Sequence, residues 1–251
     1  MPGYTTPPGP GIDANRSVRQ ASVIAGVGLL LMAVLSGVGY LVGVKGLVTQ
    51  GNPARTAKDI MGSVGLFRFG ILSLYLVAAL DVVVAWALYR VFRPVSEGIS
   101  MLAAWLRVAY AGIFAVAISQ LVGVLRLLGH AGYLAAFSTN QLHAQALLRI
   151  NTFTDIWDAG FVLFGIYLLV IACLAYKSGY VPRLLGVLLA IAGLGYLVDS
   201  FGRVLSGGSG PDISAFTGIA EFLFALWLVI WGRRITLTEP GHDGPIGAAT
   251  T

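Results

Sequence analysis

The sequence predicts an all-α fold: a polytopic transmembrane helical bundle of about six spans, with one interfacial amphipathic helix. Hydrophobic residues make up 57% of the 251 residues and charged residues only 11%, whereas an ordinary soluble domain has roughly 25% charged residues. The mean hydropathy is +0.84. Several apolar stretches reach the roughly 20 residues that are needed to cross about 30 Å of hydrocarbon. A soluble globule of this composition would expose large apolar patches to water, so we expect an integral membrane protein.

The elements follow from where the apolar stretches begin and end. Residues 1–20 contain four prolines and no apolar periodicity, so we expect a disordered tail there. The uncharged stretch 21–44 is too long for the apolar region of a signal peptide, and we interpret it as an uncleaved first span. Residues 233–251 are polar and are expected to form a second disordered tail. The predicted membrane domain, 21–232, contains spans at 21–44, 66–92, 101–128, 158–176, 184–205 and 213–231.

Between the third and fourth spans, the stretch 129–158 has a different pattern. Polar residues recur there every four positions, and an apolar stripe lies beside them. This pattern predicts an amphipathic helix that lies at the membrane interface. The polar residues are Gln141, Gln145 and Arg149, and the apolar ones are Leu142, Ala146, Ile150 and Phe153.

The distribution of charge predicts the orientation. Six spans place both termini on one side of the membrane. The short connections after the second and fourth spans carry Arg90, Arg93, Lys177 and Arg183 with a single acid, Glu97. Because short cytoplasmic loops are enriched in Lys and Arg, we expect both termini to be cytoplasmic, in a protein of the cell membrane.

One part of the chain resembles a known family. The segment LFRFGILSLYLVAALDVVVAWALYRVFRPV from Leu66, followed by MLAAWLR, is similar to the second and third helices of the bacterial domain-of-unknown-function family numbered 4386. The resemblance covers roughly residues 16–233. It runs from near Arg19 and Gly26 through Phe164 and Gly165 to KSGYVPRLLGVLLAIAGLGYLVD, and ends with Glu221 and the region from Trp227 to Trp231. It implies a multi-pass membrane protein and assigns no catalytic residue.

Charged residues inside the apolar stretches are the candidate functional groups. Asp81 lies about eleven residues, or roughly 16 Å, from the inner end of the second span, near the middle of a bilayer. An ionised side chain there costs at least roughly 2.5 to 3.5 kcal/mol, so it should face a partner. Arg107, in the adjoining antiparallel span, is the expected partner. Three interpretations are open: a structural ion pair that fixes the hairpin, part of a proton or ligand site, or an Asp81 that is protonated and neutral.

A second polar group is expected nearer the outer side. Glu221 lies about seven residues into the sixth span, and Arg68, Asp199 and Arg203 lie at comparable depth. The four could form a cluster, although Asp199 and Arg203 are four residues apart and could neutralise each other on one helix face. Paired with Arg68, Glu221 would keep its charge; unpaired in apolar surroundings, it could carry a proton. Glu221 is therefore a candidate for lining a functional cavity.

The sequence disfavours several other classes of function. Cys173 is the one cysteine, and no histidine lies inside a predicted span, so we expect no metal centre, haem or other cofactor. The cations lie singly or in pairs at the ends of apolar segments, which is typical of membrane flanks and not of a nucleic-acid interface. No phosphate-binding, zinc-protease or serine-hydrolase motif occurs. An intramembrane enzyme is therefore the least favoured class of function.

Small residues recur within the spans, and Gly39 and Gly43 have the spacing that lets helix backbones approach closely. They could form a dimerisation face or pack within one bundle. Apart from the lipid bilayer, the expected partners are a second copy of the chain or another membrane protein.

Two functions remain open at this point. The first is a non-catalytic accessory, sensory or structural component of the bacterial membrane, in which the buried charges hold the bundle together. The second is a small-molecule or proton-coupled transporter that uses Asp81, Arg107 and Glu221 at mid-membrane. A transporter needs a water-accessible cavity lined by these charges, whereas a structural bundle needs a packed interior.

Overall fold

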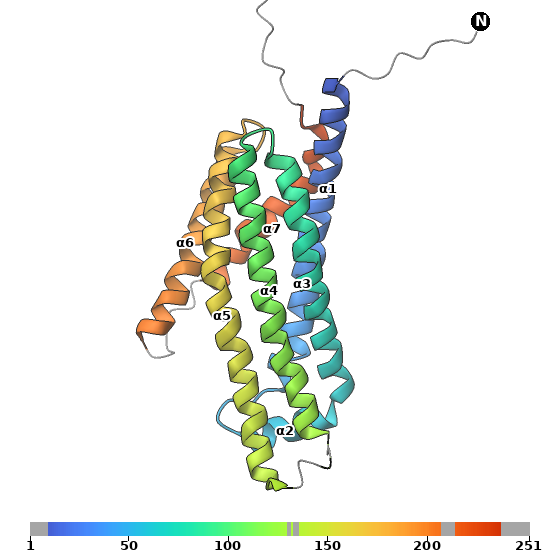
Figure 1. Cartoon of the computed structure of the whole chain (residues 1–251), viewed down its shortest axis with the longest axis vertical. Helices are drawn as coiled ribbons and strands as arrows, with labels where there is room; N and C mark the ends of the chain where they lie inside the picture. The colour runs from blue at the N-terminus through green and yellow to red at the C-terminus, as the bar shows by residue number, and fades with distance from the viewer. Residues whose placement is uncertain (1–9, 130–131, 133–135, 207–213, 237–251) are drawn as a thin grey trace, which may run out of the picture.

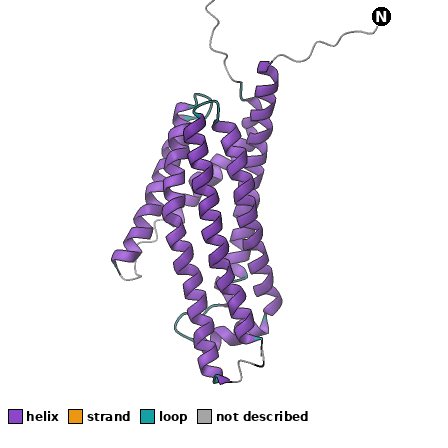
Figure 2. Cartoon of the chain, in the orientation of Figure 1, coloured by secondary structure: helices purple, strands orange, loops and turns teal. Residues whose placement is uncertain are grey.

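The computed structural model describes residues 10–129, 132, 136–206 and 214–236, with side chains for residues 15–129, 132, 136–206 and 218–236. Throughout these residues the regular structure is helical, without a strand (Figure 2). The predicted all-α helical bundle is therefore confirmed.

The helices run alternately up and down the bundle (Figure 1). α1 (Pro10–Ser36) continues through a π-helical turn (Gly37–Val42) and a short 3₁₀ turn (Lys45–Leu47) to α2 (Pro53–Gly62), which lies at one end of the bundle. We call this the α2 end. The connections at 93–96 and 178–182 lie at the opposite end, which we call the Pro94 end. The remaining helices are α3 (Val64–Phe92), α4 (Glu97–Leu128), α5 (Thr139–Lys177), α6 (Arg183–Leu205) and α7 (Ser214–Ile230).

Among the described residues, five helical segments are long and apolar enough to cross a membrane: Asn15–Leu47, Val64–Phe92, Glu97–Leu128, Thr139–Lys177 and Arg183–Leu205. The sixth predicted span corresponds to α7, which is apolar but has only 17 residues. The count of six spans therefore stays a prediction.

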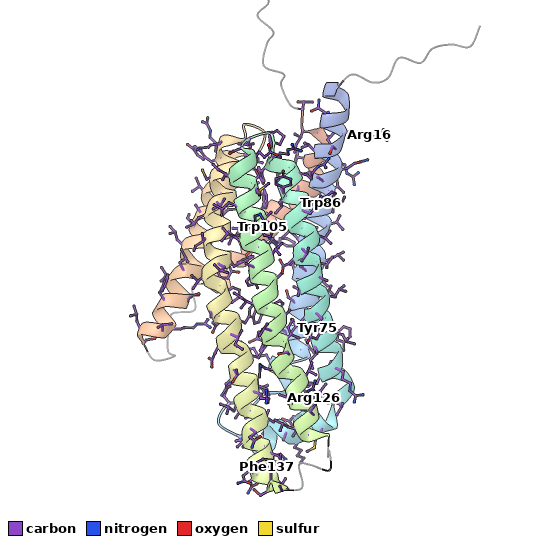
Figure 3. The ribbon with its side chains drawn as sticks, in the orientation of Figure 1. Arg16, Tyr75, Trp86, Trp105, Arg126 and Phe137 are labelled. Carbon is purple, nitrogen blue, oxygen red and sulfur yellow. The ribbon has the colours of Figure 1, made fainter. Side chains whose placement is uncertain are left out.

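The outward surfaces of the long helices are strongly apolar, as Figure 3 illustrates. Trp105 on α4 is 67% exposed, and Trp86 on α3 is 51% exposed. Leu72 on α3 and Leu184 on α6 are also exposed. Large apolar side chains that face outward on several helices are consistent with a surface that contacts lipid.

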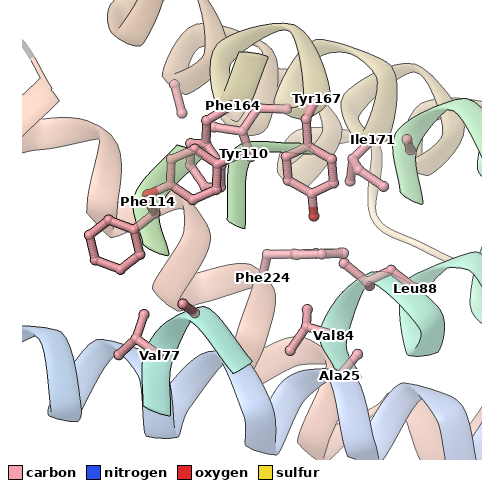
Figure 4. Packing of buried hydrophobic residues seen from close by; sticks show 14 of the residues in the cluster. Ala25, Val77, Val84, Leu88, Tyr110, Phe114, Phe164, Tyr167, Ile171 and Phe224 are labelled. Atoms are coloured by element: carbon pink, nitrogen blue, oxygen red, sulfur yellow. The ribbon is translucent and has the colours of Figure 1, made fainter. Parts of the chain in front are cut away.

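The interior is a continuous apolar cluster to which most helices contribute. Figure 4 shows its centre, where Phe224 of α7 lies between α3 and α5 and close to Leu88 and Tyr167. Phe224 also stacks on Phe92 of α3, with ring centroids 6.4 Å apart. These contacts fill the half of the bundle nearer the Pro94 end.

The first helix begins earlier than expected. Residues 1–20 were predicted to form a tail, but α1 starts at Pro10; residues 1–9 lie outside the described part. The backbone N–H groups in the first turn of a helix have no partner within the helix. Proline suits that turn because it has no N–H. Two tertiary hydrogen bonds hold the N-terminal part of α1 in place. Arg90 donates to Ser17 Oγ, and Arg19 Nε donates to the carbonyl of Ile235 at 2.8 Å.

The interfacial helix predicted within 129–158 is not a separate element. It is the first half of α5, a continuous helix of 39 residues, about 58 Å long at 1.5 Å per residue. A capping box between Ser138 and Gln141 starts this helix, and no proline interrupts it. Its apolar stripe, which includes Ile150 and Phe153, is buried inside the protein. The stripe packs on the helices beside it, α2 and α4, instead of lying on a membrane surface.

The glycines of the small-residue pattern pack within the chain. A Cβ on Gly70 of α3 would lie 2.8 Å from the carbonyl oxygen of Gly39 and 3.1 Å from the Cα of Gly43. These distances leave no room for a side chain, so the backbones of α3 and of the turn after α1 touch directly. Gly39 and Gly43 therefore serve close packing within one bundle in this structure.

Candidate functional site

A cavity of about 320 Å³ lies inside the bundle, on the α2 side of the apolar centre. Residues of α1, α3, α4, α5, α6 and α7 line it. Three of the predicted site residues, Asp81, Arg107 and Glu221, belong to this lining. The structure therefore brings together charges from the second, third and last apolar segments.

Asp81 and Arg107 form an ion pair, with Asp81 Oδ1 2.7 Å from Arg107 Nη2. Each residue is only 1% exposed. Asp81 lies on the buried face of α3, between Val77 and Val84, and that face directs it toward α4. The contact between these two residues that the hairpin geometry predicted is present.

Arg107 has further partners on two other helices. Its Nη1 donates to Tyr167 Oη of α5 at 2.7 Å, and its Nη2 approaches the sulfur of Met32 of α1 at 3.9 Å. The guanidinium also lies 5.7 Å from the ring centroid of Phe164. Arginine suits this position because its planar fork can address several acceptors and stack on a ring at the same time.

The hydrogen-bonding capacity of this pair is not filled by the described residues. Asp81 Oδ2 and Arg107 Nε are buried and have no hydrogen-bond partner among them. Leaving a buried charged group under-satisfied is costly, so each unpaired atom is a place where a polar partner would stabilise the pair. A cavity of this size has room for water or a small ligand.

Glu221 of α7 lies on another wall of the cavity and is only partly buried. Tyr196 of α6 donates its hydroxyl to Glu221 Oε1 at 3.1 Å. Within the described residues, no Lys, Arg or His nitrogen comes within 4.0 Å of its carboxylate. Glu221 therefore faces the cavity without a direct counter-ion.

The predicted cluster of Glu221 with Arg68, Asp199 and Arg203 is not assembled. Arg68 is exposed on α3, away from the cavity lining. Asp199 is buried on α6, and Arg203 one turn later pairs with Asp158 of α5. Asp199 and Arg203 do not line the cavity either, so Glu221 is the one member of the predicted cluster that belongs to the described lining.

The aromatic walls of the cavity are not among the site residues that the sequence predicted. Trp157 Nε1 donates to Tyr110 Oη at 2.9 Å, which fixes both rings in the lining. The spacing could have indicated a common face, because Trp157, Phe161 and Phe164 are four and three residues apart on α5. Seven of the described lining residues are aromatic: Tyr110, Phe114, Trp157, Phe161, Phe164, Tyr196 and Phe222.

The cavity extends from the ion pair toward the α2 end. Phe114 on α4 and Trp157 on α5 line it on that side, about two turns beyond Arg107 and Phe164 respectively. Ala33 of α1 and Gly218 and Phe222 of α7 are lining residues that are also exposed, which places the opening between α1 and α7. Immediately on the Pro94 side of Arg107 the structure leaves a void of about 10 Å³, and a separate hollow of about 870 Å³ lies further out at the Pro94 end, lined by residues that include Tyr180 and Trp227.

Metal-binding residues are not gathered at this site. In the part of the chain that the structure describes, no three His, Cys, Asp or Glu side chains lie close enough together to hold a metal ion. The groups that the cavity offers are two carboxylates, one guanidinium, hydroxyls and aromatic rings.

Comparison with known proteins gives a family and a relative. The chain is 37% identical over 168 residues to a protein of Archaeoglobus fulgidus described as "Uncharacterized protein"; the match covers 67% of this chain and 86% of that protein. No solved structure matches the chain. The model of the family described as "Domain of unknown function (DUF4386)" matches residues 24–232, and the chain therefore belongs to that family.

Proposed function

We propose that this chain is a multi-pass integral membrane protein that binds a small ligand in the cavity beside Asp81, Arg107 and Glu221. Its role is that of a sensory or accessory component, without catalysis. The observation that carries the proposal is the cavity itself: about 320 Å³ of space is lined by an ion pair and by a carboxylate that has no direct counter-ion. A bundle held together only by its charges would pack this space closed.

The distribution of charge along the bundle supports a membrane location. Asp81 lies twelve residues from Arg93 and thirteen from Arg68, or about 18 and 20 Å along α3. A bilayer core of about 30 Å fits between the levels of the two arginines, with Asp81 near its middle. The ion pair with Arg107 offsets the free-energy cost of the Asp81 charge at that depth.

The position of the chain ends supports six crossings with both termini on one side. Arg19 near the start of α1 contacts the carbonyl of Ile235, so the first and last described segments meet at the Pro94 end. The cations Arg90, Arg93, Lys177 and Arg183 lie at the same end. By the positive-inside rule this end is cytoplasmic, and the cavity extends toward the other side.

A small-molecule or proton-coupled transporter is the second candidate. The observation that favours it is the presence of two carboxylates, Asp81 and Glu221, in one cavity at mid-bundle depth. Transport also needs a route to the other side. Between this cavity and the hollow at the Pro94 end, the buried side chains of Leu168, Ile171 and Phe224 leave only the 10 Å³ void, so the two spaces are not joined and binding is the better-supported function.

Cysteine accessibility tests the proposal. In a Cys173→Ser background, Ser36→Cys places a thiol on the cavity wall, and Ala117→Cys places one in the fully buried core. A ligand site must admit small solutes, so we expect the neutral reagent methyl methanethiosulfonate to modify Cys at position 36 in the folded protein and not at position 117. Modification is measured by mass spectrometry of the protein in detergent and in lipid vesicles. Equal protection of both thiols would refute a ligand site.

A further inference from the structure

We propose that the ligand of this cavity is an organic cation: a quaternary ammonium group, or a protonated amine, with small apolar substituents. This inference rests on the proposed function and specifies its ligand. Three features of the cavity carry it, namely its excess of negative charge, its aromatic walls and its limited size.

The charges that line the cavity favour a cation. Two carboxylates and one guanidinium face the space, and Asp81 and Arg107 neutralise each other across 2.7 Å. The formal charge that remains is the one that Glu221 carries when it is ionised, a form that the hydrogen bond from Tyr196 stabilises and that a bound cation would stabilise further. Where an apolar environment screens little, such a charge attracts a positive ligand and repels an anion. An anion would also have to displace Asp81 in order to reach Arg107.

The walls have the composition of an aromatic cage. The ring of Tyr196 lies 4.9 Å from that of Phe161 and 5.3 Å from that of Phe164, centroid to centroid, and it meets the Phe164 ring almost at a right angle. The rings of Phe114 and Trp157 lie 4.9 Å apart on the same cavity. Aromatic faces attract cations by their quadrupole, and cages of this type are a common way to bind quaternary ammonium groups.

The position of Tyr196 joins the two features. Its hydroxyl bonds to the carboxylate of Glu221, while its ring packs against Phe161 and Phe164. A cation seated against these rings would therefore lie near the counter-charge. Arg107 shows the same chemistry inside this protein, since its guanidinium lies 5.7 Å from the Phe164 ring centroid.

The size and the opening limit the ligand. A volume of about 320 Å³ is at the lower end of the range for ligand sites, which is roughly 300 to 1,000 Å³, so the ligand is small. Its entrance is the gap between α1 and α7, beside Ala33 and Gly218. A Cβ on Gly218 would meet no atom within 4 Å, so a large side chain there would narrow the entrance and leave the core unchanged.

The test measures binding of radiolabelled choline to the purified full chain in detergent, with competition by tetraethylammonium and by 3,3-dimethyl-1-butanol. The last compound has the shape of choline without its charge. We expect both cations to bind, and the neutral analogue to compete at least about tenfold more weakly, because a desolvated cation–π site favours charge by this order. Equal competition by the neutral analogue would overturn the inference, and so would absence of choline binding.

Variants then locate the site. Glu221→Gln keeps an oxygen that can accept from Tyr196 and removes the charge, so we expect it to fold and to weaken choline binding about tenfold or more. Phe161→Leu and Gly218→Trp should also weaken binding. Glu97→Gln, which removes an exposed carboxylate at the Pro94 end, is the matched control and should leave binding unchanged. Binding that is unaffected by Glu221→Gln would overturn the inference.

The two proposals fail in different ways. If the thiol at position 36 reacts while choline does not bind, the cavity is an accessible site and the ligand is not an organic cation of this size. If the thiol at position 36 stays as protected as the one at position 117, the cavity is not a ligand site, and the proposed function fails together with its specified ligand.

Discussion

Two ion pairs at different depths show how surroundings change the role of the same chemistry. Asp81–Arg107 lies at the centre of the bundle, where the side chains are 1% and 2% exposed, and it lines a cavity. Asp158–Arg203 joins α5 to α6 nearer the α2 end, with side chains 19% and 29% exposed, and lines no cavity. A third pair, Arg93–Glu97, lies on the surface of the Pro94 end with both side chains more than half exposed.

The depth of an ion pair in the bundle determines how much it can contribute to stability. A surface pair exchanges water for its partner at little net gain. A pair in the interior is shielded from bulk water, so loss of one member leaves a buried charge without its counter-ion and with little solvation. The stability of the bundle should therefore respond in graded fashion to the removal of one charge at each level.

The largest effect should come from Arg107→Met, which leaves Asp81 without its counter-ion in the bundle centre. We expect a loss of about 3 to 5 kcal/mol in the free energy of unfolding, the range for breaking a buried pair from one side. Titration with SDS in mixed micelles, followed by circular dichroism, measures it.

The double variant Arg107→Met, Asp81→Asn is the control for that prediction. Because it removes both charges, it should recover most of the lost stability, as replacement of whole buried pairs does in other proteins. A double variant as unstable as the single one would show that Arg107 acts mainly through Tyr167, Met32 and Phe164 and not through its charge.

Asp158→Asn should have an intermediate effect. The amide can still accept a hydrogen bond from Arg203, and both side chains are partly exposed, so water can compensate for part of the lost charge. We expect a loss of about 1 kcal/mol in the same SDS titration. A loss as large as that of Arg107→Met would contradict the graded response.

The smallest effect should follow Glu97→Gln. Its partner Arg93 is 55% exposed and lies one turn away, in a pair of the kind that contributes about 0.5 kcal/mol or less. The change in unfolding free energy should stay within about that value and should decrease further in high salt. A clear loss that high salt does not reduce would assign a structural role to this surface position.

The contact of Asp81 with Arg107 could be predicted because a short hairpin places residues at equal depth on antiparallel helices. For Arg68, depth in the membrane alone gave the wrong position, because the direction of a side chain around the helix axis also matters. Thirteen residues separate Arg68 from Asp81, and at about 100° per residue this turns Arg68 roughly 220° away from the buried face. This rotation can be counted from the sequence, and it excludes Arg68 from the predicted cluster with Glu221.

The remaining parts of the site depend on tertiary arrangement. Trp157, Phe161 and Phe164 share a face of α5, but such a stripe is equally typical of a packed core, so nothing in the pattern indicated a cavity. The partner of Glu221, Tyr196, lies on another helix 25 residues away. The length of α5 was also missed, because its polar first half resembles an interfacial helix until α2 and α4 cover its apolar stripe.

The contact between α1 and α7 has a consequence for biosynthesis. A Cβ on Gly26 would lie within 3 Å of the backbone of Ala225 and Val229, so the first long helix docks directly on the last one. Because a ribosome makes α7 after the other described helices, α1 lacks this partner while the four long helices α3 to α6 are being made. Until then Asp81 and Arg107 have no wall on that side, and the cavity is completed only after α7 has been made.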